Sequence, residues 1–329
     1  MNGTNLLDIR DLRVSPRGMT ETAILRGVTF SVAPGETLAV VGESGCGKSM
    51  ASLAVMGLLP PGLERRSGDI LFRGEPLPVD DNTAMRKVRG RRIGMVFQEP
   101  MAALNPVYTI GHQVAEVILE HEDISAAEAR LRVVELLREV GLPSPDRIID
   151  EYPHRLSGGQ RQRVVIAMAL ACKPDLLIAD EPTTALDVTV QAQIMRLLKR
   201  AQNELGIAII LITHNLGLVA QMADRVVVMY AGHKVEEASV QTLFASPQHP
   251  YTQGLLRATP RPGRRRAGGK PLEEIPGMVP AITDLPSGCR FRPRCPRATR
   301  ECETVHPAVR QVGDTIVACH HPGRLEAVQ

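Results

Sequence analysis

The sequence lacks any segment that we expect to cross a membrane. One run of 19 residues without a formal charge, Leu205 to Ala223, has nominal membrane length, but polar residues and glycines interrupt it. A strand, a turn and a short helix explain this run better. The N-terminal residues also lack the charged-then-apolar pattern of a secretory signal. We therefore expect a cytosolic protein that reaches a membrane only by docking.

Aromatic residues and net charge are both low. Aromatics make up 3% of the chain and tryptophan is absent, so a site that needs a stacked ring has few candidates. The net charge of +3 is uneven, because 13 Lys and Arg against 7 Asp and Glu give the tail from Arg257 onward +6 and leave −3 for the preceding body. A basic tail can indicate nucleic acid or anionic lipid, but we interpret it as a solvated, loosely packed appendage.

The common CxxC spacing of zinc sites is also absent. Four of the six cysteines lie near the end of the chain, as Cys289-x5-Cys295-x6-Cys302-x16-Cys319. A cytosolic chain is not expected to hold them as disulfides. Four thiols suit zinc or an iron–sulfur cluster, and the missing CxxC favours the cluster mildly. The neighbouring His320–His321 pair leaves mixed ligation open.

A glycine-rich segment at residues 42–49 matches the P-loop pattern of glycine, four residues, glycine, lysine and serine. The apolar run Thr37–Val41 predicts a buried strand before it, and Ala51–Met56 predicts a helix after it. Backbone N–H groups and the helix N-terminus would then face phosphate oxygens. Lys48 would reach the β- and γ-phosphates, and the Ser49 hydroxyl would ligate magnesium.

Two carboxylates follow a second predicted strand, Leu176–Ala179, which ends in Asp180 and Glu181. The C-terminal end of a strand beside a P-loop is where a doubly wound sheet collects its ligand contacts. We predict that Asp180 is the magnesium-side carboxylate and that Glu181 orients or deprotonates the attacking water. His214 and Gln98 also follow or end predicted strands, but neither position alone separates a functional residue from a packed one.

Taken together, these motifs closely resemble the ATP-binding subunits of ABC transporters, over residues from about 6 to 256. A single motif would be weak, but six in the expected order are specific. They are the P-loop at 42–49, the glutamine loop at Gln98, the signature at 156–160, the magnesium-side strand ending at Asp180 and Glu181, the interface loop at 184–187, and the switch histidine His214.

The resemblance implies a role for each matching residue. Glu181, His214 and Gln98 would be catalytic, with His214 hydrogen-bonded to the γ-phosphate and Gln98 moving with a membrane partner. Asp187 would couple two sites across a dimer interface. Magnesium would be held by Ser49, Gln98 and Asp180. ATP would be bound by Gly42, Glu43, Ser44, Gly45, Cys46, Gly47, Lys48, Ser49 and Met50. The signature residues Leu156, Ser157, Gly158, Gly159 and Gln160 would cap the ATP of the opposite subunit.

One element departs from the family pattern. The family usually stacks adenine on an aromatic residue just after its first strand, and here the matching position is Pro16. Weaker base selectivity, or base contacts from elsewhere in the chain, is therefore expected.

A narrower resemblance, carried by residues 98–106, 244–252 and the cysteine-bearing end, is to the ATPases of dipeptide, oligopeptide and nickel importers. It implies peptide import as the leading function, and a [4Fe–4S] cluster on the four tail cysteines, with zinc as the alternative. It also implies two membrane permease subunits, a second ABC ATPase subunit that is a paralogue or the same chain, and a substrate-binding protein acting through the permease. The chain would be peripheral at the cytoplasmic face of the inner membrane.

The expected fold is α/β: a P-loop core with an antiparallel β subdomain, an inserted α-helical lobe at about 100–172 and a small metal-binding tail. We predict an ATPase domain at 1–256 and a linker with the tail at 257–329, the linker lying at 260–270. In the lobe, Ile110–Glu120 and Ala126–Val140 are amphipathic. The second has Leu131, Val134, Leu137 and Val140 at helical spacing and Gly141 at the C-cap position.

Two other functional classes compete with a transport ATPase. A soluble ABC ATPase acting on nucleic acid or ribosomes usually has tandem cassettes or long coiled-coil insertions, and this chain has neither, so no nucleic acid is expected. A regulatory module without hydrolysis is disfavoured because Lys48, Asp180, Glu181 and His214 are all present.

Overall fold

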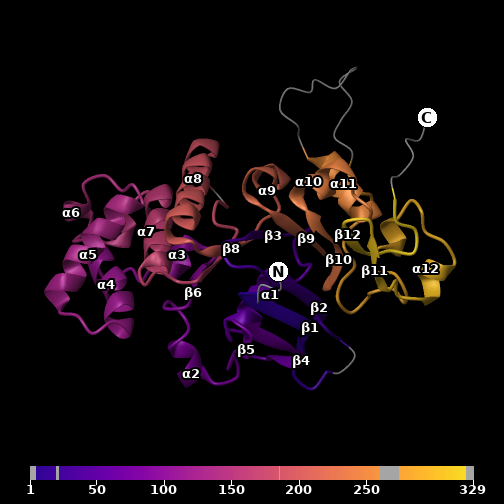
Figure 1. Cartoon of the computed structure of the whole chain (residues 1–329), viewed down its shortest axis with the longest axis horizontal. Helices are drawn as coiled ribbons and strands as arrows, with labels where there is room; N and C mark the ends of the chain where they lie inside the picture. The colour runs from indigo at the N-terminus through magenta and orange to yellow at the C-terminus, as the bar shows by residue number, and fades with distance from the viewer. Residues whose placement is uncertain (1–4, 20–21, 185, 260–273, 324–329) are drawn as a thin grey trace, which may run out of the picture.

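Two β-sheets organise the molecule, with helices at one end and the cysteine-bearing tail at the other (Figure 1). The computed structural model describes residues 5–19, 22–184, 186–259 and 274–323. The predicted linker at 260–270 lies outside these residues.

The larger sheet is mixed, with the strand order β11-β12-β10-β9-β3-β8-β7-β6. Its central strands β9, β3, β8, β7 and β6 are parallel, and β10, β12 and β11 continue it antiparallel. Strands β3, β7 and β8 are buried throughout, which explains their continuous apolar sequences. The strands are β3 (Thr37–Val41), β6 (Ile93–Val96), β7 (Leu176–Asp180), β8 (Ala208–Ile212), β9 (Arg225–Tyr230), β10 (His233–Ser239), β11 (Val309–Val312) and β12 (Thr315–Ala318).

The smaller sheet is antiparallel and has the order β2-β1-β4-β5. It is the antiparallel β subdomain that the sequence predicts near the N-terminus. Its apolar residues join those of the P-loop helix α1 (Lys48–Val55) in one hydrophobic cluster, so this sheet supports the P-loop from below. Its strands are β1 (Leu7–Pro16), β2 (Leu25–Val32), β4 (Leu63–Phe72) and β5 (Glu75–Pro76).

The charge-free run from Leu205 to Ala223 forms the end of a helix, a strand, a turn that carries His214 and a short helix, as predicted. In the part of the chain that the structure describes, no helix is both long and apolar enough to cross a membrane. The helices outside the lobe and the tail are α1, α2 (Asn82–Arg86), α8 (Val188–Leu205), α9 (Leu216–Met222), α10 (Val240–Ala245) and α11 (Pro250–Ala258).

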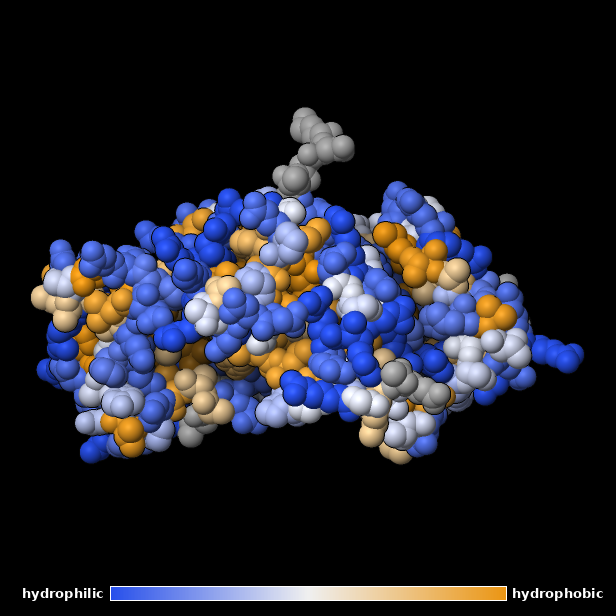
Figure 2. Space-filling view, turned by 90° about the horizontal axis from the view of Figure 1, so that it is seen from below, coloured by the Kyte–Doolittle hydropathy of each residue, from blue (hydrophilic) through white to orange (hydrophobic). Residues whose placement is uncertain are grey.

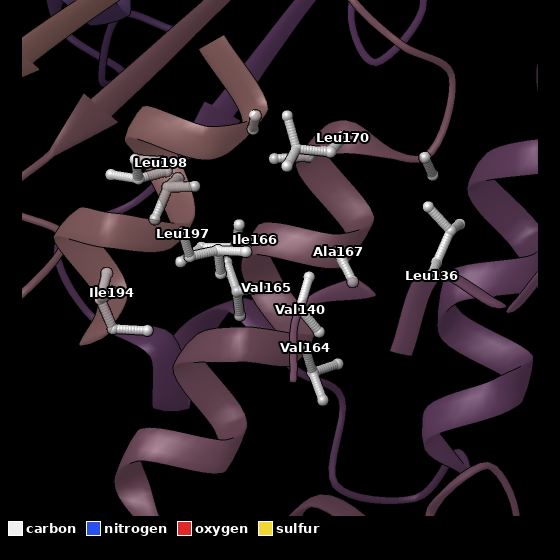
Figure 3. Packing of buried hydrophobic residues seen from close by; sticks show 14 of the residues in the cluster. Leu136, Val140, Val164, Val165, Ile166, Ala167, Leu170, Ile194, Leu197 and Leu198 are labelled. Atoms are coloured by element: carbon white, nitrogen blue, oxygen red, sulfur yellow. The ribbon is translucent and has the colours of Figure 1, made fainter. Parts of the chain in front are cut away.

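A helical lobe is inserted between β6 and β7. Helix α7 packs between α5 and α8, and Figure 3 shows Leu197 and Leu198 of α8 on one side of α7 and Val140, at the end of α5, on another. A capping box of Ser125 and Glu128 starts α5. The lobe consists of α3 (Pro100–Ala103), α4 (Ile110–His121), α5 (Ala126–Glu139), α6 (Pro145–Ile148), a 3-10 turn at Pro153–Arg155, and α7 (Gly158–Leu170).

The buried face of α5 differs from the predicted stripe. Leu137 and Val140 are buried, and Gly141 follows the helix with φ +75°, as a C-cap glycine does. Leu131, however, is 69% exposed. The core face is built on Val133 and Leu136 instead, and at 100° per residue Leu131 lies on the opposite side of the helix.

The described part of the tail is packed rather than loose. Strand β12 pairs with β10, with Glu236 opposite Val317, so the tail extends the larger sheet. Phe291 is buried against Tyr230 and Tyr251 of the core. An edge strand has unpaired backbone groups, and β12 satisfies those of β10. The remaining tail elements are the 3-10 turn η2 (Arg292–Arg294) and α12 (Glu301–Thr304).

Candidate functional site

The P-loop connects β3 to α1 through glycines whose conformations other residues rarely adopt. Gly47 has φ +102°, and a Cβ atom there would lie 2.7 Å from Leu25 Cδ2. A Cβ atom on Gly42 would lie 2.3 Å from the Met229 carbonyl oxygen. The loop therefore runs directly against the neighbouring strands, which glycine allows at these two positions.

Lys48 starts α1 and is held inside the loop. Its side chain is buried, and its ammonium donates to the carbonyl oxygens of Gly42 at 2.8 Å and Glu43 at 3.0 Å. These bonds hold the one cationic side chain of the P-loop inside the loop.

Ser49 and Asp180 lie side by side, although 131 positions separate them in sequence. The Ser49 hydroxyl donates to Asp180 Oδ1 at 3.1 Å. Burial raises the pKa of Asp180, and the hydrogen bond from Ser49 opposes that shift. A hydroxyl and a buried carboxylate are the oxygen ligands that Mg²⁺ prefers, so the pair fits the magnesium-side role predicted for it.

Glu181 is the centre of a hydrogen-bonded group. His214 Nδ1 lies 3.2 Å from its Oε1, and the Gln98 amide donates to Oε2 at 3.3 Å. The Thr184 hydroxyl also donates to Oε2, at 2.7 Å. Partial burial opposes the charged form, but the hydrogen bonds from Thr184 and His214 outweigh it and lower the pKa of Glu181. The structure thus gathers the three predicted catalytic side chains and keeps the carboxylate ionised.

The backbone of Glu181 is strained. Its φ is +47°, a left-handed value that costs a side-chain-bearing residue about 1–3 kcal/mol. Its N–H donates to the Ile212 carbonyl at 2.9 Å, which anchors the residue to β8. The turn points the carboxylate toward Gln98 and His214 instead of along β7.

The signature segment forms the exposed N-terminus of α7. Leu156 is buried, whereas Ser157 and Gly158 are exposed. Ser157 caps the helix in a capping box with Gln160. No hydrogen bond or ion pair of the described residues joins this segment to the P-loop of the same chain. An exposed helix N-terminus of this kind can bind an anion.

Asp187 begins α8, next to the signature. Its carboxylate accepts from the Val190 N–H at 2.9 Å. A Cβ atom on Gly159 would lie 2.8 Å from Val190 Cγ1, so glycine lets α7 and the start of α8 meet closely. The following residue, Val188, is 82% exposed. Asp187 and Val188 are thus both exposed beside the start of α7.

Some residues that contact this site were not predicted from the sequence. The Glu43 N–H donates to the Tyr251 hydroxyl at 2.8 Å, and Arg294 of the tail forms an ion pair with the Glu43 carboxylate at 2.6 Å. Thr184 was placed in the interface loop but not against Glu181. At the end of β1, Pro16 pairs with Leu63.

The four tail cysteines line one small cavity, together with His320 and His321. Burial raises the pKa of the Cys289, Cys295 and Cys319 thiols, and the neighbouring cysteines raise it further. Within residues 5–19, 22–184, 186–259 and 274–323, however, no group of three or more His, Cys, Asp or Glu residues is arranged to hold a metal ion.

Comparison with known proteins agrees with this geometry. Residues 25–184 match the ABC transporter family, and residues 235–302 match the oligopeptide/dipeptide transporter C-terminal region. The dipeptide transport ATP-binding protein DppD of Haemophilus influenzae is 46% identical, with 96% of each chain covered. DppD of Bacillus subtilis is 48% identical, with 96% of this chain and 92% of the relative covered. This chain belongs to the ABC transporter family.

The fold of this ABC ATPase is also that of solved cassettes. An ATP-binding cassette solved as a dimer in its post-hydrolysis state, with ADP and phosphate, superposes with a TM-score of 0.63 at 29% identity. The superposition covers 71% of this chain and 98% of the solved chain. The P-loop core, the β subdomain and the helical lobe are therefore those of an ABC ATPase.

Proposed function

We propose that Glu181 is the base that activates water for ATP hydrolysis, with Asp180 and Ser49 on the magnesium side. The observation that carries this assignment is the convergence of Gln98 and His214 on one lowered-pKa carboxylate beside the P-loop. Phosphoryl transfer needs positioned charge more than covalent help. Lys48 and Mg²⁺ would neutralise the phosphates, Glu181 would take the proton of water, and His214 and Gln98 would orient the reacting groups.

We also propose that the signature closes the site of a second ATPase subunit. Exposed Ser157 and Gly158 at a capped helix N-terminus fit the γ-phosphate of an ATP bound elsewhere. Asp187 lies on the same surface and would couple the two sites. The partner subunit is either a second copy of this chain or a paralogue.

The transported cargo is proposed to be di- or oligopeptides. Support comes from the match of residues 235–302 and from relatives named for dipeptide transport. Two permease subunits would carry the cargo, and a substrate-binding protein would deliver it to them. The ATPase would then be peripheral at the cytoplasmic face of the inner membrane.

An apolar groove supports docking to permeases. It has a volume of about 230 Å³ and lies between the core and the helical lobe, lined by residues that include Leu58, Phe97, Val117 and Met168. Leu58 is 37% exposed and Phe97 is 39% exposed. Figure 2, which views the molecule from below, shows hydrophobic surface gathered near its middle. Phe97 precedes Gln98, so a segment seated there would touch the residue before the catalytic glutamine.

A charge in this groove is expected to weaken permease binding. Leu58→Glu should reduce the amount of permease that co-purifies with the chain about tenfold or more, because it places a charge in a largely apolar contact. ATP binding by the isolated chain should persist. Leu205→Glu is the matched control, since Leu205 is 41% exposed at the end of α8 and lies outside the groove. Equal permease recovery with Leu58→Glu and Leu205→Glu would rule out docking here.

The chain is proposed to divide near residue 257 into an ATPase domain and a tail whose cysteines bind a [4Fe–4S] cluster, with zinc as the alternative. Cys289, Cys295, Cys302 and Cys319 line one cavity and would be the ligands. Arg292 and Arg297 line the same cavity and would offset the charge of thiolates. When bound, the cluster would cross-link segments of the tail.

The metal proposal predicts both composition and stability. Protein purified without oxygen should be brown and contain about four iron atoms per chain. Cys302→Ser should lose the iron and make the tail more sensitive to protease, whereas Cys172→Ser, outside the tail, should keep both properties. Equimolar zinc without iron would replace the cluster with a zinc site, and absence of both metals would reject a metal centre. Iron and zinc analysis with limited proteolysis decides among these results.

A further inference from the structure

The P-loop of this chain contains an acidic side chain, Glu43, at its second position. A carboxylate there lies close to the site of a polyanionic triphosphate. Like charges at short range oppose each other, and the effect is strong where water is partly excluded. A cation beside the Glu43 carboxylate would offset this repulsion. The Lys48 ammonium donates instead to the carbonyl oxygens of the loop.

Arg294, 251 positions away in the tail, supplies that charge. Its two terminal nitrogens donate to the two carboxylate oxygens of Glu43, at 2.6 and 3.0 Å. The arginine side chain is 3% exposed, so solvent screens this pair weakly. Its Nε donates to the Pro276 carbonyl at 2.9 Å, and its guanidinium lies 5.9 Å from the centre of the Tyr230 ring. The arginine is therefore held from several sides.

A second contact fixes the backbone of the same loop residue. The Tyr251 hydroxyl accepts from the Glu43 N–H at 2.8 Å, and Tyr251 is fully buried. Its ring packs against Tyr230 and Phe291, with ring centres 4.7 and 5.4 Å away. Glu43 is thus held at its backbone by the core and at its carboxylate by the tail.

Arg294 lies in the short turn that separates two of the cavity-lining cysteines. In this turn the Arg292 N–H donates to the Cys289 carbonyl at 3.1 Å, and the Cys295 N–H donates to the Arg292 carbonyl at 3.1 Å. The Arg294 N–H donates to the Phe291 carbonyl at 3.0 Å. The position of the guanidinium therefore depends on the order of the segment from Cys289 to Cys295.

We propose that Arg294 is a positioning residue for the ATP-binding loop: it neutralises Glu43 and holds it away from the triphosphate. The cysteine-bearing turn keeps Arg294 in place, so loss of order in that turn weakens ATP binding. The second part rests on the proposed metal site, whereas the first rests only on the P-loop and the ion pair. The affinity for ATP thereby depends on whether the segment from Cys289 to Cys295 is ordered.

Nucleotide affinity of the full-length chain tests the first part, with a fluorescent ATP analogue as the probe. Arg294→Gln should raise the Kd about tenfold, within the range of coupled sites. Because the defect is a repulsion, Glu43→Gln in the Arg294→Gln background should restore most of the affinity, and added salt should shrink the defect of Arg294→Gln alone. Arg300→Gln, which removes the same charge from an exposed tail position, should bind as the unmodified chain does. Unchanged affinity in Arg294→Gln overturns the proposal, as does a double variant no better than Arg294→Gln.

Cysteine replacement tests the second part. Cys295→Ser should lose its metal and bind the analogue more weakly, and Cys295→Ser with Glu43→Gln should still lack metal but regain affinity. Loss of metal with unchanged affinity would overturn the coupling and leave the role of Arg294 intact. If the unmodified chain holds no metal, the metal site fails, while the Arg294→Gln result still decides the ion-pair role.

Discussion

Glu181→Gln is expected to lower ATP turnover at least 100-fold, the typical scale for loss of a general base, while ATP still binds. The amide keeps the size of the side chain and can still hydrogen-bond to Thr184 and His214, but it cannot accept a proton from water. Phosphate release at saturating ATP measures this in the assembled transporter. Glu120→Gln, on an exposed face of α4, is the matched control.

The Lys48→Ala variant should lose nucleotide binding rather than turnover of bound ATP. The Lys48 ammonium bonds to the P-loop carbonyls and is proposed to face the phosphates, so its removal should weaken nucleotide binding before it affects chemistry. Glu181→Gln should instead accumulate a closed dimer with trapped ATP. Near-normal turnover in Glu181→Gln would mean that another group activates water, with Glu181 only orienting His214.

The second large effect is expected in mixed dimers that carry Ser157→Arg in one subunit. The arginine would fill the exposed helix N-terminus that we propose caps the partner's ATP, so the site built on the partner's P-loop should lose most of its turnover, by about 100-fold. Nucleotide binding at Lys48 of the altered subunit should remain. Labelled-ATP crosslinking to each subunit separates the two sites.

The control for this experiment is Asn203→Arg, an exposed position on α8 that adds the same side chain outside the interface. If Ser157→Arg abolishes crosslinking at its own P-loop and leaves the partner site active, the signature acts within its own chain. That result would contradict a dimer in which each signature serves the other subunit.

The sequence places the candidate catalytic residues together because their motifs are local patterns at strand ends. Asp180 and Glu181 follow a buried apolar strand, and strands β3 and β7 flank β8 in one parallel sheet. Parallel strands place their carboxyl ends at one edge, so separate motifs converge without further information. The meeting of Gln98 and His214 on Glu181 follows from that topology.

The contacts that the sequence did not predict depend on long-range packing. Arg294 and Glu43 carry no local signal of their pairing, since each is an ordinary charged residue in its own segment. Leu131 fits a helical spacing but lies on the wrong face, because several apolar stripes can be drawn on one short helix. The pairing of β12 with β10 was also missed, since the few residues of β12 resemble any short apolar run.

The addition of β12 to the large sheet has a consequence for shortened forms of this chain. A protein cut before residue 274 would expose the edge of β10 and the faces of Tyr230 and Tyr251 that Phe291 now covers. Unpaired strand edges next to apolar surface recruit other chains. Such a truncated protein should precipitate or form aggregates even though every nucleotide motif is intact. By covering this edge and the apolar surface beside it, the tail would keep the sheet that carries the P-loop from aggregating.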